Sequence, residues 1–202
     1  QTDRQTDRQT DRQTDRQTAL FRTIGASSHA IEEREINDYY ATHPLAVKLL
    51  LEKETFANVL EPACGEGHIS KELINLGVET TSFDLIDRGF GEVGDFFNID
   101  EWCGDIVTNP PYKIAKEFIE HGLDIIPKGR KIAMFLKLQF LEGQARRKFF
   151  DINPPKKVYV CSKRIVCAKN GEFDRFKSTA LAHAWFVWEK GFSGNPEIYW
   201  IN

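Results

Sequence analysis

The sequence predicts an α/β fold built on a mostly parallel sheet. From residue 56 to residue 161, short segments rich in β-branched and aromatic residues alternate with segments whose apolar residues recur at helical spacing. Strands that are joined through helices pair in parallel, and the helices cover both faces of the sheet. The 202 residues and the 41% hydrophobic content suffice for one domain with a buried core. We expect this domain to span residues 19–202.

The order of elements follows from the same patterns. We expect helices over 43–53, 69–76, 114–126 and 142–150, and strands over 56–63, 79–85, 105–108, 131–138, 156–161 and 182–189, with a weakly marked strand near 95–97. No helix separates the last two of these strands, because residues 162–180 form a polar stretch. The last strand should therefore run antiparallel, and residues 198–201 extend its edge.

The first 18 residues differ from the rest of the chain. Four copies of Gln-Thr-Asp-Arg precede Gln17-Thr18, and they contain no apolar residue to bury, which predicts a disordered tail over residues 1–18. A tandem CAGA repeat in the gene would encode this tetrapeptide. We therefore hypothesise a tract that can slip out of frame, with a plain polar leader as the alternative. Mixed codons across the four copies would contradict slippage.

Charge is unevenly distributed along the chain. Residues 19–127 carry a net charge of −12 and residues 128–190 a net charge of +10, although the whole chain has −3. Clusters of lysine and arginine with aromatic neighbours in the second half suit a polyanion such as nucleic acid. The alternative is a solvated surface that balances the acidic half.

Nothing in the sequence indicates a membrane span, a secretory signal or a metal site. No apolar run reaches 18 residues, and no charged segment followed by an apolar one opens the chain. We therefore expect a cytoplasmic protein with no membrane partner. The four cysteines lack CxxC spacing and the five histidines stand apart from them, so no metal is expected.

A glycine-rich turn follows the first expected strand. Gly65 and Gly67 allow the backbone to approach a ligand closely, at the end of the strand where open α/β sheets bind ligands. Ser70 replaces the third glycine of the dinucleotide-binding pattern, and Glu61 and Glu66 would repel a pyrophosphate. These carboxylates instead suit the ammonium and sulfonium groups of S-adenosylmethionine.

Two acidic residues come after the later strands. Asp84 ends the second strand 17 residues after Gly67, close to the spacing at which an acidic residue binds ribose hydroxyls. Asp95 is positioned to accept a hydrogen bond from an adenine amine while the Phe96 ring packs on the base. Each carboxylate also has a plainer interpretation, as a helix cap or surface acid for Asp84 and as a turn residue for Asp95.

The residues Asn109-Pro110-Pro111-Tyr112 end the apolar strand 105–108. An amide, two rigid prolines and an aromatic ring suit chemistry on a flat amine. The motif alone is also compatible with a rigid turn. Its position after the glycine turn and Asp84 favours methyl transfer to nitrogen.

Over nearly all of residues 19–202 the chain resembles the S-adenosylmethionine-dependent N6-adenine DNA methyltransferases, particularly the small phage-associated type. Residues 39–44, Tyr-Tyr-Ala-Thr-His-Pro, resemble the family's motif before the first strand. Residues 61–67 resemble its glycine motif, and residues 109–112 its catalytic motif. The resemblance implies a Rossmann-like class I methyltransferase fold with a seven-stranded, mostly parallel sheet and an antiparallel final strand.

The resemblance also implies roles for single residues. Asn109 Oδ1 and the Pro110 carbonyl would accept hydrogen bonds from the exocyclic amine, Pro111 belongs to the same rigid turn, and Tyr112 would stack on the flipped base. The residues expected to bind S-adenosylmethionine are Tyr40, Thr42, Glu61, Ala63, Cys64, Gly65, Gly67, Asp84, Asp95 and Phe96.

The expected function is methyl transfer to adenine N6 in DNA. Larger family members carry a separate target-recognition domain, whereas about 40 residues follow the sixth expected strand here. Selectivity would then come from residues 163–177, from a separate specificity partner, or be low. RNA or a protein glutamine as substrate, and a non-catalytic cofactor- or DNA-binding remnant, remain the alternatives.

Overall fold

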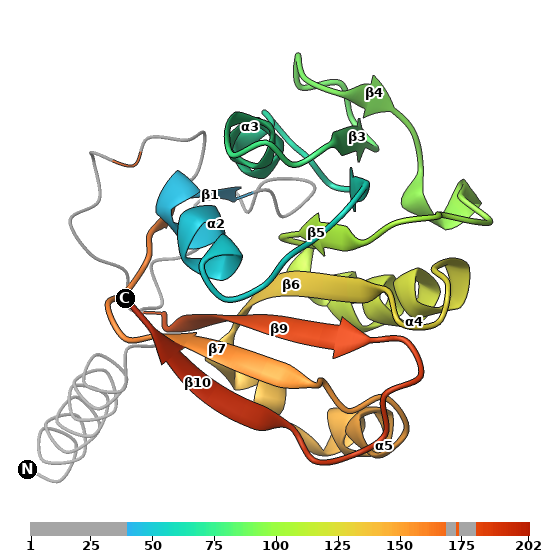
Figure 1. The fold of residues 1–202 in the computed structure, drawn as a ribbon, viewed down its shortest axis with the longest axis vertical. Helices are drawn as coiled ribbons and strands as arrows, with labels where there is room; N and C mark the ends of the chain where they lie inside the picture. The colour runs from blue at the N-terminus through green and yellow to red at the C-terminus, as the bar shows by residue number, and fades with distance from the viewer. Residues whose placement is uncertain (1–39, 169–172, 174–180) are drawn as a thin grey trace, which may run out of the picture. The chain divides into compact units, whose positions relative to one another are not determined.

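The computed structural model describes residues 40–168, 173 and 181–202, which belong to one compact unit spanning residues 38–202 (Figure 1). The repeat over residues 1–18 lies outside the described residues, so its predicted disorder stays a prediction. In the described part of the chain, no helix is long and apolar enough to cross a membrane.

A mixed sheet of eight strands, in the order β10-β7-β9-β6-β5-β2-β3-β4, forms the centre of this unit. All neighbouring strands are parallel except β9, which runs antiparallel to both β6 and β7. The predicted fold class is confirmed, and β10 adds an eighth strand at the edge. The strands are β2 (Val59–Glu61), β3 (Thr80–Asp84), β4 (Glu92–Val93), β5 (Ile106–Thr108), β6 (Lys131–Lys137), β7 (Lys157–Cys161), β9 (His183–Glu189) and β10 (Glu197–Ile201).

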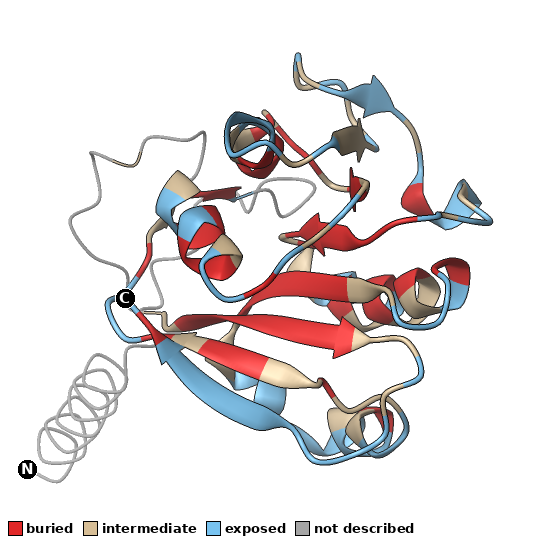
Figure 2. Cartoon of the chain, viewed as in Figure 1, coloured by how far each residue is buried: buried red, intermediate tan, exposed pale blue. Residues whose placement is uncertain are grey.

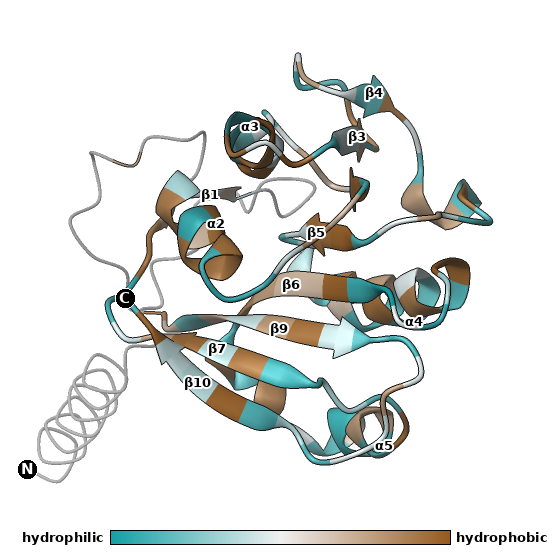
Figure 3. Cartoon of the chain, viewed as in Figure 1, coloured by the Kyte–Doolittle hydropathy of each residue, from teal (hydrophilic) through white to brown (hydrophobic). Residues whose placement is uncertain are grey.

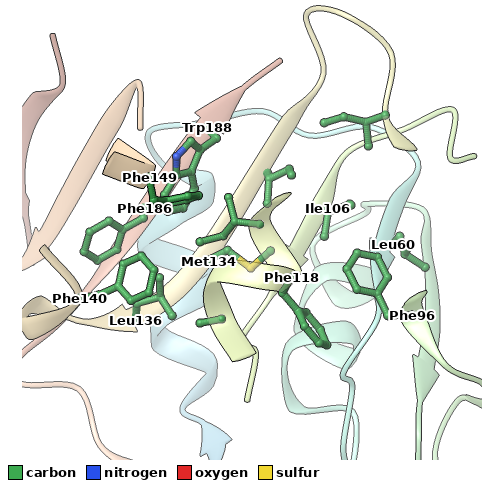
Figure 4. Close-up of a cluster of buried hydrophobic side chains, with 14 of the residues drawn as sticks. Leu60, Phe96, Ile106, Phe118, Met134, Leu136, Phe140, Phe149, Phe186 and Trp188 are labelled. Carbon is green, nitrogen blue, oxygen red and sulfur yellow. The ribbon is translucent and has the colours of Figure 1, made fainter. Parts of the chain in front are cut away.

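Helices cover both faces of the sheet, because successive strand residues point to opposite sides. On β6, Met134 and Leu136 join the cluster that contains residues of α4 and α5, and Ala133 and Phe135 join the cluster that contains residues of α2 and α3. Figure 4 shows Met134 among the rings of the first cluster. Figure 2 shows the resulting burial of β5, β6 and β9, and β5 is largely hydrophobic in Figure 3. The helices are α2 (Pro44–Leu51), α3 (His68–Asn75), α4 (Ala115–Ile125) and α5 (Gln144–Ile152).

Two short strands differ from the sequence-based expectation. The weak third strand near residues 95–97 was placed wrongly, since β4 is Glu92–Val93 and Phe96–Asn98 forms a 3₁₀ turn. The Asp95 side chain caps this turn by accepting from the Phe97 amide at 3.0 Å, which favours a turn over extended backbone. The polar stretch 162–180 contains a two-residue strand, β8 (Cys167–Ala168), which pairs antiparallel with β1 (Ala41–Thr42). Residues 169–172 and 174–180 lie outside the described residues.

The amino ends of the parallel strands are joined by a buried ionic cluster around Glu54. Its carboxylate accepts from Lys131 at 2.8 Å, from Lys157 at 2.9 Å and from the Tyr159 hydroxyl at 2.5 Å. Burial raises the pKa of Glu54, but the hydrogen bonds from Lys131, Tyr159 and Lys157 outweigh it and lower the pKa to about 2. The cluster therefore ties the end of α2 to the starts of β6 and β7.

Replacing Glu54 should destabilise the domain. In Glu54→Gln the two lysines lose their carboxylate, and we expect the free energy of unfolding at pH 7 to fall by about 2 to 4 kcal/mol. Because the folded pKa lies below the ordinary 4.5, the wild-type advantage is complete above pH 4.5 and disappears as the pH falls towards 2. Urea denaturation at pH 7 and pH 3 measures both effects.

The matched control for this prediction is Glu120→Gln. Glu120 pairs with Lys116 at 3.3 Å on the exposed face of α4, where 40% of its side chain is accessible. Exposed pairs contribute about 0 to 1 kcal/mol, so this variant should unfold almost like the wild type. Equal stability losses in the two variants would show that the Glu54 cluster has no special role.

Candidate active site

The polar residues of the predicted site follow parallel strands and therefore reach one edge of the sheet. Glu61 ends β2, Asp84 ends β3, and Asn109 comes directly after β5. β2 lies between β3 and β5 in the sheet, with Glu61 paired to Ser82 and Leu60 to Ile106. Glu61 and Asn109 are 48 positions apart in the sequence, with Asp84 between them, yet all three lie at the ends of adjacent strands.

The glycine turn links β2 to α3 in a conformation that only glycine adopts readily. Gly65 and Gly67 have φ values of 54° and 81°, and Gly67 donates its amide to the Cys64 carbonyl at 2.8 Å. A Cβ atom on Gly67 would lie 2.3 Å from the Phe90 ring. Phe90 thus packs directly against the turn, and the second glycine is required by contact as well as by backbone angle.

Asp84 holds the glycine turn against β3. Its Oδ2 accepts from the Gly65 amide at 2.8 Å, and its Oδ1 accepts from the Ile86 amide at 3.0 Å. The Cys64 amide also donates to the Phe83 carbonyl at 2.9 Å. The structure therefore brings Asp84 next to the turn, as the spacing predicts. Each carboxylate oxygen still has acceptor capacity, so a role in binding ribose hydroxyls stays a proposal.

Glu61 is buried beneath the turn, with 1% of its surface accessible. Ser70 of α3 donates its hydroxyl to Glu61 Oε2 and lies 2.6 Å from the Ser82 hydroxyl of β3. Burial raises the pKa of Glu61 to about 8, although the bonds from Ser70 act in the opposite direction. The carboxyl group is therefore largely protonated at neutral pH unless a cation approaches it.

Other predicted cofactor residues differ in accessibility. Cys64 is buried, and burial raises the pKa of its thiol to about 12, which makes it an unreactive packing residue. Ala63 is partly buried against the core. Phe96 is 2% exposed and packs against Phe118 at 4.8 Å and His121 at 4.8 Å between ring centroids. The contact of Phe96 with adenine stays a prediction, and the neighbouring Phe97 is the more exposed ring at 41%.

The Asn109 side chain is hydrogen-bonded to β1 and the residue before it, not to the neighbouring strands of its own sheet. Its Nδ2 donates to the Tyr40 carbonyl at 3.1 Å and to Thr42 Oγ1 at 3.0 Å. Pro110 is buried, and Pro111 has φ −55° and ψ 121° before the 3₁₀ turn Tyr112–Ile114. The turn therefore presents the Asn109 amide in a fixed orientation.

Tyr112 lies at the start of the 3₁₀ turn with its ring partly buried. The Lys137 ammonium, at the end of β6, is 4.6 Å from the ring centroid, and the Phe140 ring makes an edge contact at 6.4 Å. Phe140 is 2% exposed and belongs to the core, whereas Gln139 and Glu142 are exposed. A cation on an aromatic face is an attractive contact, so Lys137 helps to hold the ring.

Three contacting residues were not predicted as parts of the site. Ser82 completes the network below Glu61, His43 caps α2 by accepting from the Leu45 amide at 3.1 Å, and Phe90 packs on Gly67. The cap had a sequence signal in the His43-Pro44 pair, since proline favours the first helical position. Ser82 and Phe90 had none, because their partners come from other strands.

The buried Glu61 should make stability depend on pH. Since its folded pKa is about 8 against an ordinary 4.5, its burial costs stability as the pH rises from 4.5 to 8. Glu61→Gln removes this cost, so relative to the wild type it should gain at most about 5 kcal/mol between these pH values, since each tenfold change in proton affinity is worth about 1.4 kcal/mol. Chemical denaturation of both proteins across this range is the measurement. Parallel stability curves would contradict a protonated Glu61.

Solved structures resemble this chain in fold at low sequence identity. No protein-family model matches the chain, and no curated protein matches it in sequence. A putative class I S-adenosylmethionine-dependent methyltransferase from Listeria monocytogenes superposes with a TM-score of 0.54 at 16% identity, covering 91% of this chain and 70% of that one. A putative RNA methyltransferase from Pyrococcus horikoshii gives 0.50 at 14% identity, covering 73% and 80%. The M protein of the type I restriction enzyme EcoKI gives 0.50 at 15% identity, covering 78% and 45%.

At these identities the likeness concerns the fold. In this chain the superposed fold is a mixed α/β architecture with a mostly parallel sheet and one antiparallel strand, β9. The chain therefore has the Rossmann-like fold of class I methyltransferases.

Proposed function

We propose that the protein transfers a methyl group from S-adenosylmethionine to the exocyclic N6 amine of adenine in DNA. The observation that carries the proposal is the position of Asn109 in the Asn-Pro-Pro-Tyr turn. Asn109 follows β5, which neighbours β2, the strand that leads into the glycine turn. Its amide nitrogen donates to the Tyr40 carbonyl, just before β1, and to the Thr42 hydroxyl on β1. Its Oδ1 is thereby the oxygen available to an amine.

The residues at the carboxyl edge fit S-adenosylmethionine. The positive φ angles of Gly65 and Gly67 allow close approach to a ligand. Asp84 offers acceptor capacity for ribose hydroxyls, and Glu61 has a carboxyl group that an approaching cation would ionise. The bound cofactor would supply the electrophilic methyl group. The protein's own part is to hold the two reactants in line.

The Asn109 turn supplies the positioning. Asn109 Oδ1 and the Pro110 carbonyl would accept from the two amine hydrogens, which draws the nitrogen lone pair out of conjugation and aims it at the methyl group. Tyr112 would stack on the base, which any aromatic ring can do from its free face. The nitrogen–methyl bond would form as the methyl–sulfur bond breaks, and the neutral thioether would leave. The methylated amine would then release its extra proton to water, so displacement needs little beyond position and electrostatics and no general base.

The choice of DNA as substrate is supported less directly. Among the basic residues of the second half, Lys131 and Lys157 are paired with Glu54, Lys156 with Glu189 and Arg147 with Asp151. For these four residues, the ion pairs favour a surface in which the charges balance one another over a site for a polyanion. Lys137, beside Tyr112, remains well placed for a polyanion. The neighbours include a restriction-enzyme M protein and a putative RNA methyltransferase, so RNA is the second substrate to test.

The decisive variant is Asn109→Ala. Without the amide the amine loses an acceptor that acts in the transition state, so we expect kcat to fall by about 100-fold or more, as for loss of one preorganised hydrogen-bonding group. The affinity for S-adenosylmethionine, measured by calorimetry, should stay within about 3-fold because the cofactor residues are intact. Methyl transfer is measured with labelled cofactor and DNA, RNA or a glutamine-containing protein.

Asn75→Ala is the matched control, since Asn75 is an exposed residue at the end of α3. It should retain wild-type transfer. Label in RNA or protein alone would reject DNA as the substrate, and cofactor binding without transfer to any acceptor would favour the non-catalytic remnant. Full activity of Asn109→Ala would remove the proposed mechanism.

A further inference from the structure

The Asn109 amide has only one orientation that satisfies its neighbours. The Tyr40 carbonyl can accept a hydrogen bond but cannot donate one, so the group that faces it at 3.1 Å has to be the NH₂ group. Thr42 Oγ1, at 3.0 Å, accepts from the same nitrogen. A flipped amide would place Oδ1 against the Tyr40 carbonyl oxygen and lose that bond, although the Thr42 hydroxyl could turn its hydrogen towards Oδ1.

One acceptor, Thr42, lies on the short strand β1, and the other, Tyr40, directly precedes this strand. β1 pairs with β8, Ala41 opposite Ala168 and Thr42 opposite Cys167, and Ala41 and Thr42 are each 2% exposed. The chain then enters α2, whose Ala46 carbonyl accepts from the indole of the buried Trp185 at 2.8 Å. Thr42 is therefore part of the packed structure, and the Tyr40 carbonyl is held next to it through the buried Ala41.

We infer that the Tyr40 carbonyl and the Thr42 hydroxyl are positioning groups that make residue 109 a one-sided acceptor and require asparagine there. The inference rests on the proposed function, in which Oδ1 receives the amine. An ionised carboxylate would serve equally well as an acceptor for the amine, but its second oxygen would face the Tyr40 carbonyl, and two acceptors repel each other. Thr42 thereby acts on the amide, a role different from the cofactor contact that the sequence predicts.

The variant Asn109→Asp tests whether the reaction needs an asparagine amide at this position or only an oxygen that accepts from the amine. At pH 8 the new carboxylate should be turned away from its place, and we expect kcat to fall by about 100-fold. A protonated carboxyl group can donate to the Tyr40 carbonyl and still accept with its other oxygen. The ratio of variant to wild-type kcat should therefore rise at least 10-fold as the pH falls from 8 to 6.

Taking this ratio removes the effect of other titrating groups, because the wild type contains them as well. The titratable groups on the described elements around the turn include Tyr40, His43, Lys48, Glu61, Asp84, Tyr112, Lys113, Lys131, Lys137, Cys167, His183 and Glu189. A ratio that stays constant with pH would overturn the inference, as would full activity of Asn109→Asp at pH 8.

Thr42 variants test the second positioning group. Thr42→Val removes the acceptor at nearly constant volume, and we expect kcat at saturating cofactor to fall about 10-fold, whether or not the cofactor affinity also falls. Thr42→Ser keeps a hydroxyl and should restore kcat. Thr108→Val is the control: Thr108 is 0% exposed and directly precedes Asn109, but its Oγ1 has no hydrogen-bond partner among the described residues. If Thr42→Val weakened cofactor binding and left kcat unchanged, Thr42 would be a cofactor residue only.

A measurement that needs no activity keeps this inference distinct from the proposed function. In the ¹⁵N spectrum of the free 23.2 kDa protein, the side-chain amide pair that disappears in Asn109→Asp belongs to Asn109. Both hydrogens should be protected from exchange with water in the wild type, and at least one should lose protection in Thr42→Val. Protection without methyl transfer would reject the function and keep the positioning. Transfer without protection would reject the positioning.

Discussion

The candidate site depends on the burial of β5 on both faces. Ile106 and Val107 are both fully buried, but they belong to different core clusters, one on each side of the sheet. A slip by one residue would exchange the two faces, so the register of β5 against β6 is fixed by packing. At its start, Asp105 accepts from the Ala57 and Lys131 amides, both at 2.8 Å. Asn109 thus reaches the sheet edge at a position that the core determines.

The two edges of the sheet each hold a buried glutamate, and the pKa values of the two are shifted in opposite directions. Glu54 at the amino edge has three hydrogen-bond donors and stays ionised, with its pKa lowered to about 2. Glu61 at the carboxyl edge is hydrogen-bonded by the hydroxyl and backbone of Ser70 and by no charged group, and burial raises its pKa to about 8. A fully paired carboxylate stabilises the fold but has little capacity left for a ligand. The group at the carboxyl edge keeps that capacity at a cost in stability, as is usual for a binding site.

The sequence predicts most of this arrangement because most of it follows from local patterns. The strand–turn–helix around Gly65 and Gly67, the helix before it and the turn after β5 each have a signal within a few residues. The prediction of the third strand was wrong because this strand, Glu92–Val93, has only two residues, both exposed, and is too short to show any periodicity. The hydrogen bonds from Asn109 to Thr42 and Tyr40 could not be predicted either, since these partners lie 67 and 69 positions before Asn109 in the sequence.

The Thr42 hydroxyl belongs to the motif over residues 39–44 and also accepts a hydrogen bond from Asn109 of the motif over residues 109–112. A threonine hydroxyl has one hydrogen to donate and two lone pairs to accept with. Its acceptor side is used by Asn109, which leaves its hydrogen available to a different partner. If that partner is an oxygen of the bound cofactor, the bond that holds the cofactor also fixes the hydroxyl in the rotamer that orients the amide. Thr42 would then have two compatible roles, the amide contact that the structure shows and the cofactor contact that the resemblance implies, and the antiparallel pairing of β1 with β8 connects the orientation of Asn109 to Cys167 and Ala168.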